Sequence, residues 1–120
     1  MFPSFDEINV GDIFGGTTGY SMRLPKWFKV VKKTAKQLRL IELQEDILSG
    51  QRNGQWYSIP SDRVQTDFDG NEVAPRVGTM RVSKIDNKPW AIRINSRYEK
   101  VYLSTKYNGV DDALYGDDMD

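Results

Sequence analysis

Basic and aromatic residues alternate along one stretch of the chain in a way that suits contact with nucleic acid. Between Ile13 and Ile41 there are seven basic residues and no acidic one: Arg23, Lys26, Lys29, Lys32, Lys33, Lys36 and Arg39. Trp27 and Phe28 lie among them, and such a mixture can pair lysines with phosphates while bases stack on the rings. The alternative, which we favour, is a solvated strand whose aromatic rings point into the core. With period two, both strand faces would mix lysines with apolar residues.

Two other groups of residues could bind ions, but neither has the spacing that such a site requires. The glycine-rich segment Gly11–Ser21 could hold phosphate on its backbone N–H groups. It contains neither Gly-Lys-Ser/Thr nor GxGxxG, and no helix is expected after it. A loose acidic cluster lacks the ligand positions of a calcium loop, so we interpret it as solvated turn residues: Asp62, Asp67, Asp69 and Glu72.

The chain contains neither cysteine nor histidine. The lack of cysteine excludes disulfides, thiol nucleophiles and cysteine-ligated zinc. The lack of histidine removes the side chain most often used for proton transfer near neutral pH. Serine, threonine and tyrosine are plentiful, yet none has an evident activating base. We therefore expect a non-enzymatic protein with no catalytic residue, no metal site and no cofactor.

Short segments with period-two alternation predict the elements that position these residues. The predicted strands are 12–14, 26–33, 37–43, 55–59 (ending at Pro60), 78–85, 90–95 and 101–103. The Gly-rich residues after Phe14 are interpreted as a loop. Glu42–Ser49 is the only plausible short helix. Six or seven strands at this spacing predict an all-β single domain, either a barrel or a sandwich, with an SH3-like barrel as first choice and an OB-like barrel as second.

One domain is the natural expectation for 120 residues, and we place it at residues 1–106. From Tyr107 the composition turns to Gly, Asn and Asp, which predicts a flexible acidic tail over residues 107–120. Its acids are candidates for docking on a basic partner: Asp111, Asp112, Asp117 and Asp118. No apolar run approaches the ~20 residues that span a bilayer, and the N-terminus lacks a signal-peptide pattern. We therefore expect a cytoplasmic protein without a membrane partner.

The stretch Gly11–Leu43 resembles a group of small proteins encoded by phages and other mobile elements. In that group Gly-Asp-Ile-Phe precedes a loop ending in Gly-Tyr, an aromatic-rich strand, a Lys/Thr turn and a strand with Leu-Arg-x-Ile. The matching segments here are GDIF (11–14), GY (19–20), WFKVVKKTAK (27–36) and LRLIEL (38–43). Many relatives carry Trp before Gly-Tyr, where this chain has Thr18. The resemblance implies a phage or mobile-element origin and no particular activity.

Small phage proteins often act on host machinery, including defence nucleases, and this analogy shapes the expected function. We expect a protein that binds and inhibits a host protein or nucleoprotein, as an anti-CRISPR inhibitor would, in the host cytoplasm if phage-encoded. The alternative is a direct nucleic-acid-binding β-barrel. A protein partner would be anchored by residues of the types that are typical of interface hot spots: Tyr20, Arg23 and Trp56. Phosphates would contact the basic hairpin: Lys29, Lys32, Lys33 and Lys36. The oligomeric state is left open.

Overall fold

The computed structural model describes residues 5–18, 24–52, 54–66, 68–74, 76–78, 90–93 and 100–117. These ranges contain eight strands and two short 3₁₀ helices, which confirms the predicted all-β class. No helix in them is long and apolar enough to cross a membrane. The elements are η1 (Phe5–Glu7), β1 (Ile13–Thr18), β2 (Leu24–Lys33), β3 (Gln37–Arg52), β4 (Gln55–Val64), β5 (Arg76–Gly78), β6 (Trp90–Arg93), β7 (Lys100–Lys106), η2 (Val110–Asp112) and β8 (Leu114–Asp117).

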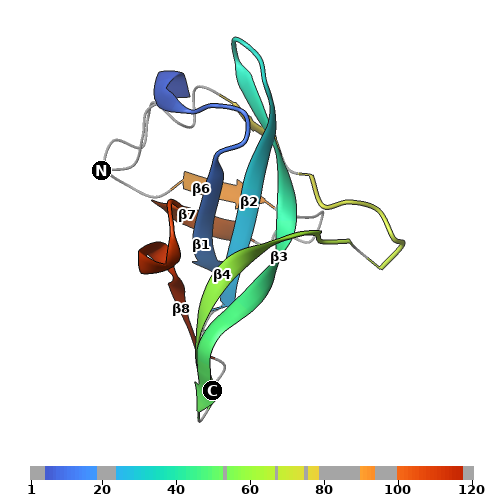
Figure 1. The fold of residues 1–120 in the computed structure, drawn as a ribbon. Helices are drawn as coiled ribbons and strands as arrows, with labels where there is room; N and C mark the ends of the chain where they lie inside the picture. The colour runs from blue at the N-terminus through green and yellow to red at the C-terminus, as the bar shows by residue number, and fades with distance from the viewer. Residues whose placement is uncertain are drawn as a thin grey trace.

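All eight strands belong to one antiparallel sheet, which curls into a half-barrel (Figure 1). Their order is β6-β7-β1-β2-β3-β4-β8, and β5 pairs with β3 beside this path. The sixteen-residue β3 pairs with β2 along its first half and with β4 along its second half. The register shifts once between β2 and β3 and three times between β3 and β4. Extra residues at such shifts bend and twist a strand, which explains the strong curl.

The main core lies on one face of β1, β2 and β3. Phe14, Phe28 and Glu42 are directly opposite one another in the register, so their side chains share a face. Val30 and Leu40 form the next such pair on that face. The fully buried apolar residues assigned to this core are Ile8, Phe14, Phe28, Val30, Leu38, Leu40 and Leu103. Burial of this apolar surface is the largest favourable contribution to folding.

A second core surrounds Trp27, which points to the other face because successive strand residues alternate. The fully buried Trp27 donates its Nε1–H to Oγ of Ser58 at 2.9 Å. Its ring meets the Tyr107 ring edge-on, with centroids 5.4 Å apart. Gly15 lies opposite Trp27, and a Cβ there would be 2.4 Å from Trp27 Cζ3 and 2.9 Å from Leu114 Cδ1. Only glycine at this position lets the indole lie against β1 with β8 packed over it.

The Gly-Asp-Ile-Phe motif fixes the turn that leads into β1. Gly11 has φ +99°, a conformation that side-chain-bearing residues rarely adopt. Its N–H donates to the carbonyl of Val30 at 2.8 Å. The Asp12 carboxylate accepts the N–H of Asn9 at 2.9 Å and lies 3.6 Å from Nζ of Lys106. At least these two positions of the segment that resembles phage proteins therefore serve the fold.

Three local predictions are wrong. The predicted helix Glu42–Ser49 lies within β3, because β2 and β4 pair with that strand in succession. Pro60 does not end β4, which continues to Val64. The proline sits opposite Glu45 beside a register shift, where a missing N–H is tolerated. The expected Gly-rich loop begins as strand, since β1 extends to Thr18.

The flexible tail expected from Tyr107 is, as far as Asp117, a part of the fold. Its strand β8 pairs with the first four residues of β4. Gly116 lies directly opposite Trp56, and a Cβ on it would be 2.4 Å from Trp56 Cε2. Composition misses this strand because it has four residues and all its partners are far away in the sequence. The structural boundary proposed at residue 106 therefore does not separate a domain from a tail.

Candidate functional site

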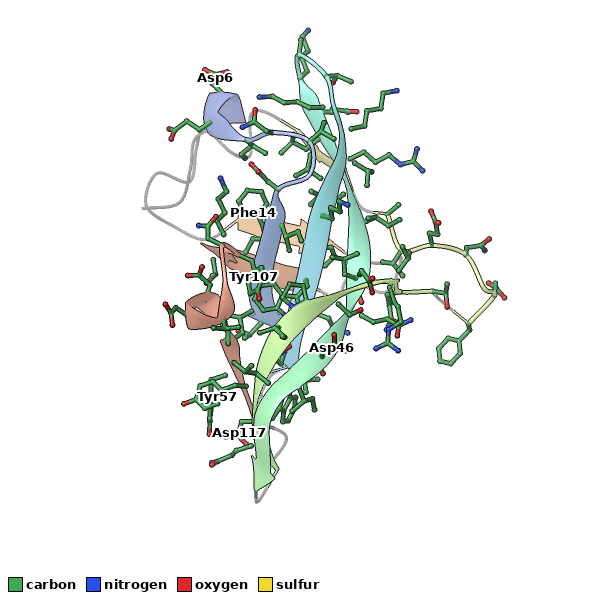
Figure 2. All side chains as sticks on the ribbon, in the orientation of Figure 1. Asp6, Phe14, Asp46, Tyr57, Tyr107 and Asp117 are labelled. Atoms are coloured by element: carbon green, nitrogen blue, oxygen red, sulfur yellow. The ribbon has the colours of Figure 1, made fainter. Side chains whose placement is uncertain are left out.

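Three exposed cations, Lys29, Lys32 and Arg39, share one face of the β2–β3 hairpin, and we call them the basic face. Lys32 lies directly opposite Arg39, and Lys29 lies opposite Ile41. Because Arg39 and Ile41 are two residues apart on β3, both pairs project to the same side of the sheet. None of the ion pairs among the described residues includes a member of the basic face. Nitrogen-tipped side chains gather around the upper end of this hairpin in Figure 2.

The two other predicted phosphate contacts, Lys33 and Lys36, differ in their surroundings. Lys33 is half-buried, and its Nζ donates to the carbonyl of Ile8 at 2.8 Å. It ties the segment after η1 to the hairpin, so a phosphate would compete with this contact. Lys36 is exposed in the hairpin turn, where Thr34 Oγ1 accepts the Gln37 N–H at 3.0 Å. Lys36 can therefore extend the basic face, whereas Lys33 has a structural role.

The aromatic residues of the basic strand are not available for base stacking. Trp27 and Phe28 have no exposed surface, and they point to opposite faces of the sheet into the two cores. This confirms the interpretation of a solvated strand with core aromatics. A nucleic acid at the basic face would meet charge and hydrogen-bond donors there, without an indole or phenyl ring from β2.

Trp56, predicted as a binding anchor, lies in the core. It is 8% exposed and packs against Gly116. Its Nε1–H donates to Oε2 of Glu45 at 3.3 Å, and the Ser58 hydroxyl donates to the same oxygen. Ser58 also accepts from Trp27, so one chain of hydrogen bonds links both tryptophans. The remaining predicted anchors, Tyr20 and Arg23, lie outside the described residues.

The C-terminal acids do not form one free docking segment. Asp111 is exposed, whereas Asp112 is half-buried and its carboxylate accepts the N–H of Asn108 at 2.9 Å. Asp117 belongs to β8. Asp118 lies outside the described residues.

The loop after β4 presents an aromatic side chain that the sequence reasoning missed. We call residues 66 and 68–72 the Phe68 loop, because the side chain of Phe68 is fully exposed. The loop stands off from the sheet in yellow (Figure 1). Thr66 pairs with Glu72 at its base, and Gly70 makes the turn with φ +81°. Asp69 is exposed beside Phe68. One signal in the sequence could have identified it. Phe68 lies inside an acidic turn and has no apolar residue two positions before or after it, so it does not belong to an alternating strand.

Backbone hydrogen bonds hold the base of the Phe68 loop to β3. Gln65 donates its N–H to the carbonyl of Glu42 at 2.9 Å, and Glu42 donates its N–H to Val73 at 2.8 Å. Val73 closes the set by donating to the carbonyl of Gln65 at 3.2 Å. The two ends of the loop are thus held against β3 and against each other.

Two further surface features accompany these sites. Tyr57 is 48% exposed and lies opposite Tyr115, with ring centroids 5.8 Å apart. Asp117 follows two residues later on the same face, and Figure 2 shows Tyr57 and Asp117 on the same side of the molecule. A hollow of about 170 Å³ is lined by Lys32, Thr34, Gln37, Leu38 and Arg39. A second, of about 260 Å³, is lined by Pro25, Lys26, Leu43, Gln44, Glu45 and Gln65.

The two hollows differ in charge. The first hollow is lined by two cations and no carboxylate, whereas the second is lined by both a cation, Lys26, and a carboxylate, Glu45. The first hollow therefore favours an anionic group. No protein-family model, curated protein or solved structure matches this chain.

Proposed function

We propose that this chain is a non-enzymatic, phage-type protein that binds a host protein or nucleoprotein and inhibits it. The observation that carries the proposal is the Phe68 loop, which holds a fully exposed phenyl ring on a base fixed by backbone hydrogen bonds. Exposed single aromatics are common enough on surfaces to need no explanation by themselves. The fixed base favours this ring as an anchor, because less backbone entropy is lost on binding than for a ring on a free segment.

The charges around the exposed rings favour a protein partner over bare nucleic acid. Asp69 and Glu72 follow Phe68 in the loop and are exposed. Asp117 shares a face with the Tyr57–Tyr115 pair. Carboxylates at these positions would repel phosphates, whereas a protein pocket with an apolar floor and a Lys or Arg rim would be complementary. The expected partner surface is of this kind.

Inhibition of a nucleic-acid-dependent defence enzyme, such as a CRISPR effector, is the sharpest version of the proposal. Its support is the resemblance to phage proteins together with the segregated charges. A basic rim is common on enzymes that handle nucleic acid, because such enzymes neutralise phosphates with Lys and Arg. An acidic, aromatic loop that docks on such a surface would obstruct the path of the nucleic acid.

A pull-down from host lysate tests the proposal, with and without nuclease treatment. Wild type and Phe68→Ala are compared, and Val10→Ala is the matched control because Val10 is also an exposed apolar residue. Burial of a phenyl ring contributes about 1.5–3 kcal/mol. Phe68→Ala should therefore weaken binding to the captured, purified protein by about tenfold to a hundredfold. The captured enzyme should lose activity when wild type is added.

Two results would count against this function. If nuclease treatment removes the partner and the purified, nucleic-acid-free protein does not bind the chain, the chain binds nucleic acid and the protein is only carried along. If Phe68→Ala and Val10→Ala bind equally well, the Phe68 loop is not the anchor. Direct nucleic-acid binding is the second candidate function, and the exposed cations of the basic face are the observation that favours it.

A further inference from the structure

The basic face places like charges directly opposite one another. Lys32 and Arg39 are cross-strand partners. Two basic residues thus occupy one row across neighbouring strands, which lie about 4.8 Å apart. Like charges directly opposite are unfavourable in an antiparallel pair. In a solvated strand that binds no ligand, a neutral or acidic residue in this row would make the pairing more stable.

The surroundings of this row are suited to an anion. The hollow beside it combines the two cations with polar Thr34 and Gln37, and no carboxylate lines it. Thr34 fixes the turn by accepting the backbone N–H of Gln37 at 3.0 Å. The row is therefore held on a defined hairpin end. Lys29 continues the same positive charge along the strand direction.

We infer that the basic face binds the phosphodiester backbone of a nucleic acid strand, through Lys32 and Arg39 with Lys29 beside them. The Arg guanidinium forms bidentate contacts with a phosphate, and Lys adds a point charge. An acidic peptide is the less suitable ligand, because protein interfaces also need an apolar centre. The lining of this hollow is mainly polar and charged.

The buried positions of Trp27 and Phe28 set the character of this binding. Without rings from β2 there is no stacking on that strand, so affinity comes from charge and is independent of base sequence. Binding to bare nucleic acid should be weak, in the ~10⁻⁴–10⁻⁶ M range of non-specific contacts at physiological salt. If the protein also docks through the Phe68 loop, its target is a nucleoprotein, and this last step alone rests on the proposed function.

Fluorescence anisotropy with the full chain tests the inference directly. The probe is a labelled single-stranded oligonucleotide of about 20 nucleotides, longer than a typical single-strand site. Each phosphate contact contributes about 0.7 to the salt slope, or about fivefold in affinity at 0.1 M salt. Lys32→Gln and Arg39→Gln should each weaken binding by about fivefold. The control Arg63→Gln removes the same charge from an exposed arginine paired with Asp46, and it should bind as wild type does.

The expected pattern is equal binding to oligothymidylate and to mixed sequence, with the loss confined to the basic-face variants. The inference is overturned if wild type does not bind at low salt, if Arg63→Gln loses as much affinity as Lys32→Gln, or if polyglutamate binds as tightly as the oligonucleotide. The proposed function is tested separately, by the effect of Phe68→Ala on binding to the captured protein. In the oligonucleotide assay the same variant should have unchanged affinity, because Phe68 is not part of the basic face. Loss of one activity with retention of the other tells the two failures apart.

Discussion

Replacing Gly116 with alanine should destabilise the fold, because β8 lies against the ring of Trp56. The added Cβ would be 2.4, 2.7 and 2.9 Å from Cε2, Cζ2 and Cδ2 of that indole. The ring cannot move aside easily, since it is 8% exposed and its Nε1–H is bonded to Glu45. Overpacking of this kind costs about 1–3 kcal/mol. With about 2.1 cal/mol/K of unfolding entropy per residue, 120 residues convert this to a fall in Tm of about 4–12 °C.

Thermal melting followed by circular dichroism measures this shift, with Gly109→Ala as the matched control. A Cβ at Gly109 meets nothing within 4 Å, and the residue has extended backbone geometry. In open surroundings alanine lowers the entropy of the unfolded chain, which is neutral or slightly stabilising. The two glycine-to-alanine changes should therefore separate clearly. Equal melting temperatures for both variants would refute the placement of β8 over Trp56.

Three further predictions follow from the contacts described above. Deletion of residues 107–120 should lower Tm by more than ~5 °C, because Tyr107 and β8 cover Trp27; an unchanged melt would mean that this segment is dispensable. Ser58→Ala removes the partner of the Trp27 indole N–H and should cost about 1–3 kcal/mol in urea unfolding, and a loss below the error of the fit would contradict that bond. Lys32→Gln relieves the repulsion from Arg39 and should raise stability by about 0.2–1 kcal/mol, where a decrease would show a structural role for the lysine.

The strands that could be predicted are those whose alternation is visible locally. The segments 26–33 and 37–43 lie within β2 and β3, and their pairing as a hairpin is confirmed. The apolar residues alternate there because successive side chains point to opposite faces of the sheet, one of which is buried and the other solvated. At Trp27–Phe28 the alternation fails, since both faces of the sheet are covered.

The predictions that fail concern partners distant in sequence. Glu42–Ser49 has no strong local preference, and only pairing with β2 and β4 makes it strand. β8 is recognisable only once Trp56 is known to lie opposite Gly116. For the candidate site, the exposed lysines followed from the charge run, whereas the engagement of Lys33 with Ile8 depends on where the N-terminal segment crosses the hairpin. No local pattern encodes that crossing.

The pairing of β1 with β7 and of β4 with β8 has a consequence for how fast the chain folds. The meander from β2 to β4 joins neighbours in sequence, but Phe14 must find Lys106 across most of the chain, and Trp56 must find Gly116 across half of it. Such high contact order places folding in the millisecond-to-second range. Until the late strands dock, the indole of Trp27 remains uncovered. Stopped-flow tryptophan fluorescence should therefore show its main change in the slowest refolding phase, and the transient meander is the species most exposed to aggregation.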